Sequence, residues 1–162
     1  MTGVVMLQSA GGFGGTSDIS ISTINGQLVP TFEDTTRGNK QLSVAAHDVH
    51  WAENVLSDND WLRIGNANDA DSGYIAELDG TIVFCSGHFE QTNANSKNVH
   101  LFINGADQGS LGTLGGGANA TFINTTINID FSQGDRIRLQ AQNGSGGNIQ
   151  DTVVRMSLKW RA

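Results

Sequence analysis

The chain has 162 residues, of which 38% are hydrophobic and only 15% charged, and its net charge is −7 at pH 7. This length suits one domain with its own core, and the composition excludes a coiled coil, a collagen and a charge-driven disordered protein. The acidic balance argues against nucleic acid as a partner, and no apolar run approaches the ~20 residues of a membrane-spanning helix. The single cysteine, Cys85, allows no internal disulfide, which predicts synthesis in a cytoplasm.

The first 40 residues are rich in glycine and serine, and alone they bury too little apolar surface to fold. We therefore predict two parts, an extended N-terminal arm over residues 1–40 and a body over residues 41–162. In the arm, Phe13 is an apolar anchor among glycines, and isoleucines at short intervals could add an edge strand to a neighbour's sheet. The predicted partner-binding residues of the arm are Gly11, Gly12, Phe13, Gly14, Gly15, Ile19, Ile21 and Ile24.

Residues 45–56 fit two patterns. Val49, Ala52 and Leu56 could share a helical stripe, whereas the run from Asp48 to Trp51 alternates as a strand does. We favour extended or mixed structure here, and the pattern leaves helix and strand both open. The same region opens an acidic stretch, residues 48–80, in which eight carboxylates accompany a single basic residue. The simplest interpretation of this stretch is a solvated rim.

From Trp61 onward, apolar side chains recur at every second position. In the last segment one face carries Val154, Met156, Leu158 and Trp160, which we expect to be buried in the core or against neighbours. Tight turns are predicted at four dipeptides, namely Asp79-Gly80, Asn104-Gly105, Gly134-Asp135 and Asn143-Gly144. About eight short strands without a convincing helix predict an all-β fold, an antiparallel β-sandwich or jelly roll.

No motif points to catalysis. A Gly-x-Ser-x-Gly elbow, a phosphate-binding loop and a dinucleotide fingerprint are all missing, and Cys85 lies in an apolar run typical of a buried residue. We therefore predict no enzyme activity, no catalytic residues and no cofactor. One or two exposed aromatic rings could instead form a platform for a sugar.

Two groups of residues are candidate metal ligands. His47 and His50 are three residues apart and have no cysteine at zinc-binding spacing. The best candidate for a cation such as calcium is a loop that offers several oxygen ligands, from Asn66, Asn68, Asp69 and Asp71. Because Asn and Asp also stabilise turns without a metal, we favour no metal site there.

Six short motifs follow one another from Trp61 to the end of the chain. They are Trp61-Leu62-Arg63-Ile64-Gly65, Asp71-Ser72-Gly73-Tyr74-Ile75, Asp79-Gly80-Thr81-Ile82-Val83, Leu101-Phe102-Ile103-Asn104-Gly105, Phe131-Ser132-Gln133-Gly134-Asp135-Arg136-Ile137 and Leu158-Lys159-Trp160-Arg161. In this order they resemble bacteriophage virion proteins that carry a trimeric jelly roll similar to the complement globular domain and to tumour necrosis factor. The resemblance covers about 100 residues, from Trp61 to the end of the chain, and none of the arm.

This resemblance implies a homotrimer without enzyme activity, made in the host bacterial cytoplasm and located on the virion. An arm that begins at Met1 with no fibrous shaft favours a head decoration (cement) protein, which binds the major capsid protein and stabilises the head. One alternative is the receptor-binding tip of a tail fibre or spike, with a host surface glycan as its ligand. A second alternative, from another class, is a soluble carbohydrate-binding β-sandwich. None of these roles involves nucleic acid or a membrane.

Overall fold

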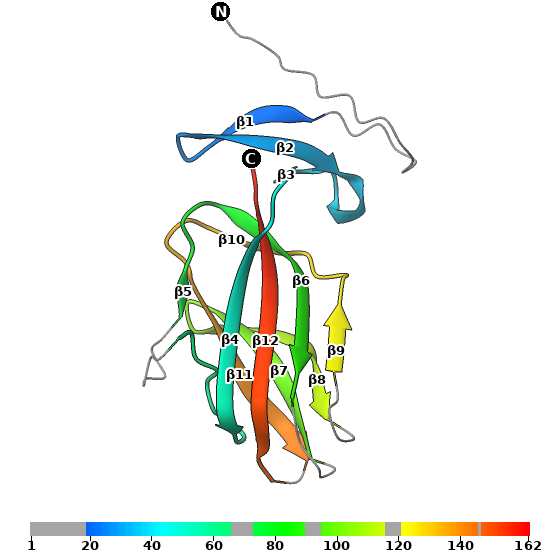
Figure 1. Ribbon diagram of the computed structural model, residues 1–162. Coiled ribbons are helices and arrows are strands. Elements are labelled where there is room, and N and C mark those ends of the chain that lie inside the picture. The colour runs from blue at the N-terminus through cyan, green and yellow to red at the C-terminus, as the bar shows by residue number, and fades with distance from the viewer. Residues whose placement is uncertain (1–18, 66–72, 90–94, 116–120, 146) are drawn as a thin grey trace, which may run out of the picture.

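The computed structural model describes residues 19–65, 73–89, 95–115, 121–145 and 147–162. Two sheets form a β-sandwich, which is the body, and a third sheet lies at one end of it (Figure 1). We call the third sheet, β1 to β3, the cap. Apart from one short 3-10 turn (Thr35–Arg37), the regular elements in these ranges are the strands β1 (Ser20–Ile24), β2 (Gln27–Asp34), β3 (Lys40–Ser43), β4 (His47–Leu56), β5 (Tyr74–Ile75), β6 (Gly80–His88), β7 (Ser96–Ile103), β8 (Ala106–Gly115), β9 (Thr121–Asn124), β10 (Ile129–Phe131), β11 (Arg136–Ser145) and β12 (Ile149–Trp160).

The strands of the body pair in a nested order. The first strand, β4, pairs with the last, β12; β5 pairs with β11, β6 with β9 and β10, and β7 with β8. All these pairs are antiparallel, and such nesting is the arrangement of a jelly roll. Since β9 and β10 share one position along β6, the body has eight strand positions. The predicted antiparallel sandwich of about eight strands is confirmed.

The ambiguous region before residue 56 is a strand. Strand β4 pairs with β12 along its length, from Leu56 opposite Ile149 to His47 opposite Leu158. Its inward side chains Val49 and Trp51 are buried, and the alternating residues His50 and Ala52 face water. The period of two therefore prevails over the helical stripe, because β4 buries only one side against the second sheet.

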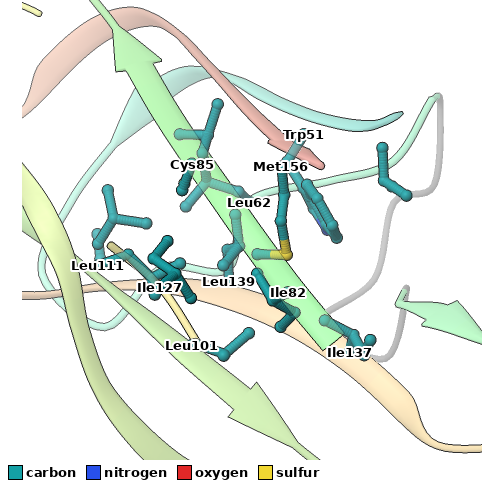
Figure 2. Packing of buried hydrophobic residues seen from close by; sticks show 14 of the residues in the cluster. Trp51, Leu62, Ile82, Cys85, Leu101, Leu111, Ile127, Ile137, Leu139 and Met156 are labelled. Carbon is teal, nitrogen blue, oxygen red and sulfur yellow. The ribbon is translucent and has the colours of Figure 1, made fainter. Parts of the chain in front are cut away.

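The core lies between the two sheets of the body. Figure 2 shows side chains from both sheets gathered there, among them Trp51, Leu101 and Met156. Of the last-strand residues singled out above, Val154, Met156 and Leu158 are completely buried within one chain. Trp160 is half-buried, with its ring 5.7 Å from the ring of His47. These side chains therefore pack in the body's own core and at its end.

One open side of the sandwich is closed by the segment between β4 and β5. The amide of Leu62 donates to the carbonyl of Leu139 in β11 (3.0 Å), and the amide of Arg63 donates to the carbonyl of Ala52 in β4 (3.1 Å). A single segment thus hydrogen-bonds to an edge of each sheet. This satisfies edge groups that would otherwise be available to other chains.

The opposite side is closed by an aromatic ring. Phe122 of β9 lies against Gly87 in β6 and Gly112 in β8, and a Cβ at either glycine would be 2.3 Å from the ring. The ring therefore occupies space that a side chain at either glycine would need. The packing of Phe122 between the sheets therefore requires a residue without a side chain at both positions.

Two of the four predicted turns are wrong. Asn104-Gly105 joins β7 to β8 with φ values of 51° and 86°, and Gly134 has a φ of 85°, as tight turns need. Gly80 and Gly144, in contrast, are strand residues without a left-handed backbone. A Cβ at Gly80 would meet the ring of Phe131, so this glycine serves close packing rather than a turn.

The cap differs from the predicted arm. Residues 20–43 form a three-stranded antiparallel sheet, in which a two-residue turn at Asn25-Gly26 (φ 45° and 85°) joins β1 to β2. Asn-Gly is a strong signal for this hairpin turn, and Ile24, Thr31 and Leu42 are buried as the sheet packs. This corrects the boundary predicted at residue 40, which is the first residue of β3. Phe13 and the glycines Gly11, Gly12, Gly14 and Gly15 lie outside the described residues.

Candidate functional site

Arg37 joins the cap to the body. Residues 125–128, between β9 and β10, are unpaired along β6, and the pairing of β6 with β12 skips Val83. These interruptions leave carbonyl groups without partners in the ladder. The Arg37 guanidinium donates to the carbonyls of Val83, Thr125 and Ile127, each at 3.1 Å. One side chain thus replaces missing ladder bonds and attaches the cap.

Two ion pairs hold the same junction. Asp34 lies 2.7 Å from the Arg37 guanidinium and accepts hydrogen bonds from Thr36. Burial raises the pKa of Asp34, but the hydrogen bonds from Thr36 and Arg37 outweigh it and hold this pKa below its ordinary value. On the other side of the junction, Lys40 Nζ lies 2.6 Å from Asp130. The pKa of Asp130 is also lowered: burial opposes the shift, and hydrogen bonds from Lys40 and Thr81 outweigh burial.

The cap should loosen in acid. Because the folded-state pKa of Asp34 is depressed, its contribution to stability is present above the unfolded-state value of 3.8 and is lost as the pH falls through the folded-state value. We expect the melting temperature to fall progressively below about pH 4. Asp34→Asn should lower the melting temperature at pH 7 and flatten this acid dependence, as followed by circular dichroism. The matched control is Glu33→Gln at an exposed position of β2, and equal acid dependence in both variants would contradict the assignment.

The outer face of the β1–β2 hairpin is apolar. In the register of the hairpin Ile21 lies opposite Pro30, and Thr23 lies opposite Leu28, so these side chains share one face. Ile21 is 53% exposed and Leu28 76%, and Pro30 is exposed as well. We call Ile21, Leu28 and Pro30 the hairpin face. Single exposed apolar residues are ordinary, but adjacent ones on one hairpin are typical of a contact surface.

The isoleucines predicted to bind a partner differ in their exposure to solvent. Ile21 belongs to the hairpin face, whereas Ile24 points the other way and is 2% exposed. Ile19 is half-buried and directly precedes β1. Leu28 and Pro30 were missed. The Asn25-Gly26 dipeptide was the signal that could have found them, because a two-residue turn fixes which residues lie opposite one another.

The candidate metal ligands named in the sequence analysis do not come together in the described residues. His47 is half-buried against Tyr74 and Trp160, and His50 points to water from the other face of β4. No group of three or more His, Cys, Asp or Glu side chains suited to a metal ion occurs in the described part of the chain. The loop with Asn66, Asn68, Asp69 and Asp71 lies outside that part.

Cys85 is completely buried in the core, and burial raises the pKa of its thiol to about 12. At neutral pH this cysteine is therefore a protonated thiol without access to solvent. It is suited to packing rather than to nucleophilic chemistry.

The Phe, Tyr and Trp rings of the described ranges are buried or partly buried. Arg138 lies over the ring of Trp61, with its guanidinium carbon 3.9 Å from the ring centroid, and Phe102 meets the same ring edge-on at 5.0 Å. Trp51 is completely buried. Among the large hydrophobic residues that are exposed in the described ranges, none is aromatic.

Part of the acidic stretch is paired rather than simply solvated. Asp48 contacts Arg155 at 2.8 Å, and Glu53 contacts Arg63 at 2.7 Å. Asp58 lies 3.0 Å from the ammonium group of Lys97, a core-facing side chain that is only 1% exposed. Hydrogen bonds from Lys97 and from the Gly144 amide lower the pKa of Asp58. These carboxylates neutralise specific cations of the body.

No helix in the described ranges has the length and apolarity needed to cross a membrane. Comparison of the sequence with protein-family profiles and with curated proteins finds no match to either.

Proposed function

We propose that this protein is a phage capsid decoration protein, a homotrimer that binds the major capsid protein on the surface of the head. The observation that carries the proposal is the hairpin face. The hairpin face exposes apolar side chains on the cap, and Arg37 attaches the cap to the body. In the sequence the cap closely follows residues 1–18. A contact surface on a firmly attached sheet is suited to binding another protein.

The body supports the proposal through its architecture. Its nested pairing is that of a jelly roll, the fold implied by the resemblance of the body to phage virion proteins. Its two open sides are closed by residues 57–64 and by Phe122, and several of its acids form ion pairs. Such a body is suited to a structural role. Three copies around one axis would engage three capsid subunits, and the linkage would strengthen attachment through effective concentration.

Loss of the hairpin face should abolish attachment. We expect Ile21→Ser/Leu28→Ser to remain folded, because both side chains are more than half exposed, and to lose binding to undecorated heads in a pelleting assay. The control is Val153→Ser, which removes an apolar side chain that is 45% exposed on the body. Normal attachment of the double variant would contradict the proposal.

The number of copies per virion distinguishes a decoration protein from a receptor-binding tip. A copy number comparable with that of the capsid subunits supports decoration. A protein restricted to the tail would contradict it. Binding of a host surface glycan by the isolated protein would favour the tip or a carbohydrate-binding β-sandwich.

A further inference from the structure

Among the described residues, one edge of the cap has no partner strand. Within the cap β2 lies between β1 and β3, and the other side of β3 meets the end of the chain, where the amide of Ala162 donates to Gln41 (3.0 Å). No strand in the described ranges pairs with the outer side of β1. Figure 1 shows β1 on the side of the cap away from the body. This edge is therefore open to a strand from elsewhere.

The register shows which groups are available there. A two-residue turn makes Ile24 and Gln27 a hydrogen-bonded pair, and such pairs alternate along an antiparallel ladder. Ile21 and Thr23 therefore direct their backbone N–H and C=O groups away from β2. Pro30 lies opposite Ile21 in a pair that exchanges no hydrogen bonds between β1 and β2. The missing N–H of Pro30 therefore removes no hydrogen bond from the β1–β2 ladder. Two donors and two acceptors thus face outward from β1.

The edge has none of the usual protection against pairing. Exposed edge strands commonly carry a lysine, a proline or a bulge that prevents addition of another strand. Strand β1 has the sequence Ser-Ile-Ser-Thr-Ile, with no charge and no proline, and its pairing with β2 has no bulge. Such an edge is suited to strand addition, in which backbone hydrogen bonds supply affinity.

We propose that the residues Val4–Leu7 of a second copy of the chain add to this edge as a fourth strand. This run, Val-Val-Met-Leu, is uncharged like β1 and is the longest apolar run of the first 18 residues. Its side chains are apolar on both faces, as in strands that are covered on both sides. On one face they would extend the hairpin face beside Ile21.

The length of the segment between Val4–Leu7 and β1 favours pairing with β1 of a second copy over pairing within the same chain. Residues 8–19 separate the run from β1, whereas hairpin loops usually have 2–5 residues. Twelve extended residues reach about 40 Å, enough to meet a neighbour. In a closed trimer each copy would donate one segment and receive one, so no open chain of copies results. The inference rests on the trimer of the proposed function and adds the element that joins its subunits.

Cross-linking of the full-length chain tests the exchange. In Val5→Cys/Thr23→Cys the new thiols would lie on adjacent strands, and buried Cys85 would not react. A short bis-maleimide should give covalent dimers and trimers on a denaturing gel. The control Val5→Cys/Val153→Cys, with its second thiol on the body, should remain monomeric. Cross-links only within one chain, or none, would overturn the proposal.

Hydrogen exchange gives an independent measurement on the free protein. The amides of Ile21 and Thr23 should exchange at least about tenfold more slowly in the intact chain than in a variant lacking residues 1–8. Equal rates would overturn the inference. Sedimentation and head binding are measured separately. A trimer that binds heads without cross-links or protection would therefore refute the exchange while leaving the proposed function standing.

Discussion

Leu158→Asp should unfold the body. Leu158 is completely buried in the central strand β12, opposite His47 in β4 and Ile82 in β6. The substitution removes a core side chain and places a carboxylate in apolar surroundings, for a loss of about 4 kcal/mol or more. That is much of the 5–15 kcal/mol by which domains are ordinarily stable. Urea denaturation should show the loss, and sedimentation should show no trimer.

Val153→Asp is the matched control for this variant. Val153 lies on the same strand but points outward and is 45% exposed. A loss of about 1 kcal/mol is expected there, from the lower strand preference of aspartate. A wild-type midpoint for Leu158→Asp would show that β12 is not the central strand of the core.

Gly112→Val should give the second large loss. Its Cβ would lie 2.3 Å from the ring of Phe122, which also lies against Gly87 and cannot retreat in that direction. Overpacking of this kind costs about 1–3 kcal/mol, measurable by thermal or urea denaturation. Gly147→Ala is the control, because the nearest atom to its Cβ would be 3.4 Å away and little change is expected.

A double-mutant cycle tests the cause of this loss. Gly112→Ala and Phe122→Ala should each destabilise the protein, the first by collision and the second by the loss of packing. Combined, they should cost at least about 1 kcal/mol less than the sum of the single variants, because removal of the ring removes the collision. Simple additivity would show that the ring and the glycine do not share one space.

The body was largely predictable from local pattern. The alternation in β12 predicted which side chains face the core, and Asn104-Gly105 predicted a hairpin that the structure contains. These features depend on period and turn chemistry, which adjacent residues determine. Gly80 and Gly144 were misread because a glycine can serve a turn or a close approach. Only the distant partners, Phe131 and Ser96, distinguish the two uses.

The attachment of the cap could not be predicted in this way. Arg37 binds carbonyls that become available only when β9 and β10 leave a gap along β6 and when β6 bulges at Val83. None of these conditions is visible in residues 34–40. The hairpin itself had a signal in Asn25-Gly26, but the glycine and serine content of the surrounding residues favoured an arm. Composition describes the average character of a segment, whereas a single two-residue turn determines which residues of two strands lie opposite one another.

The nested pairing has a consequence for the order in which the protein can fold during synthesis. Strand β6 lies between β12 and the pair β9 and β10, and all three leave the ribosome after it. Until β12 emerges, the run Thr81–Phe84 has no central neighbour, and its apolar, β-prone character is typical of sequences that aggregate. The β1–β2 hairpin, by contrast, needs only adjacent residues and can form early. The β1–β2 hairpin can therefore form transiently on the nascent chain before its packing partners arrive, whereas β6 remains prone to aggregation until β12 emerges beside it.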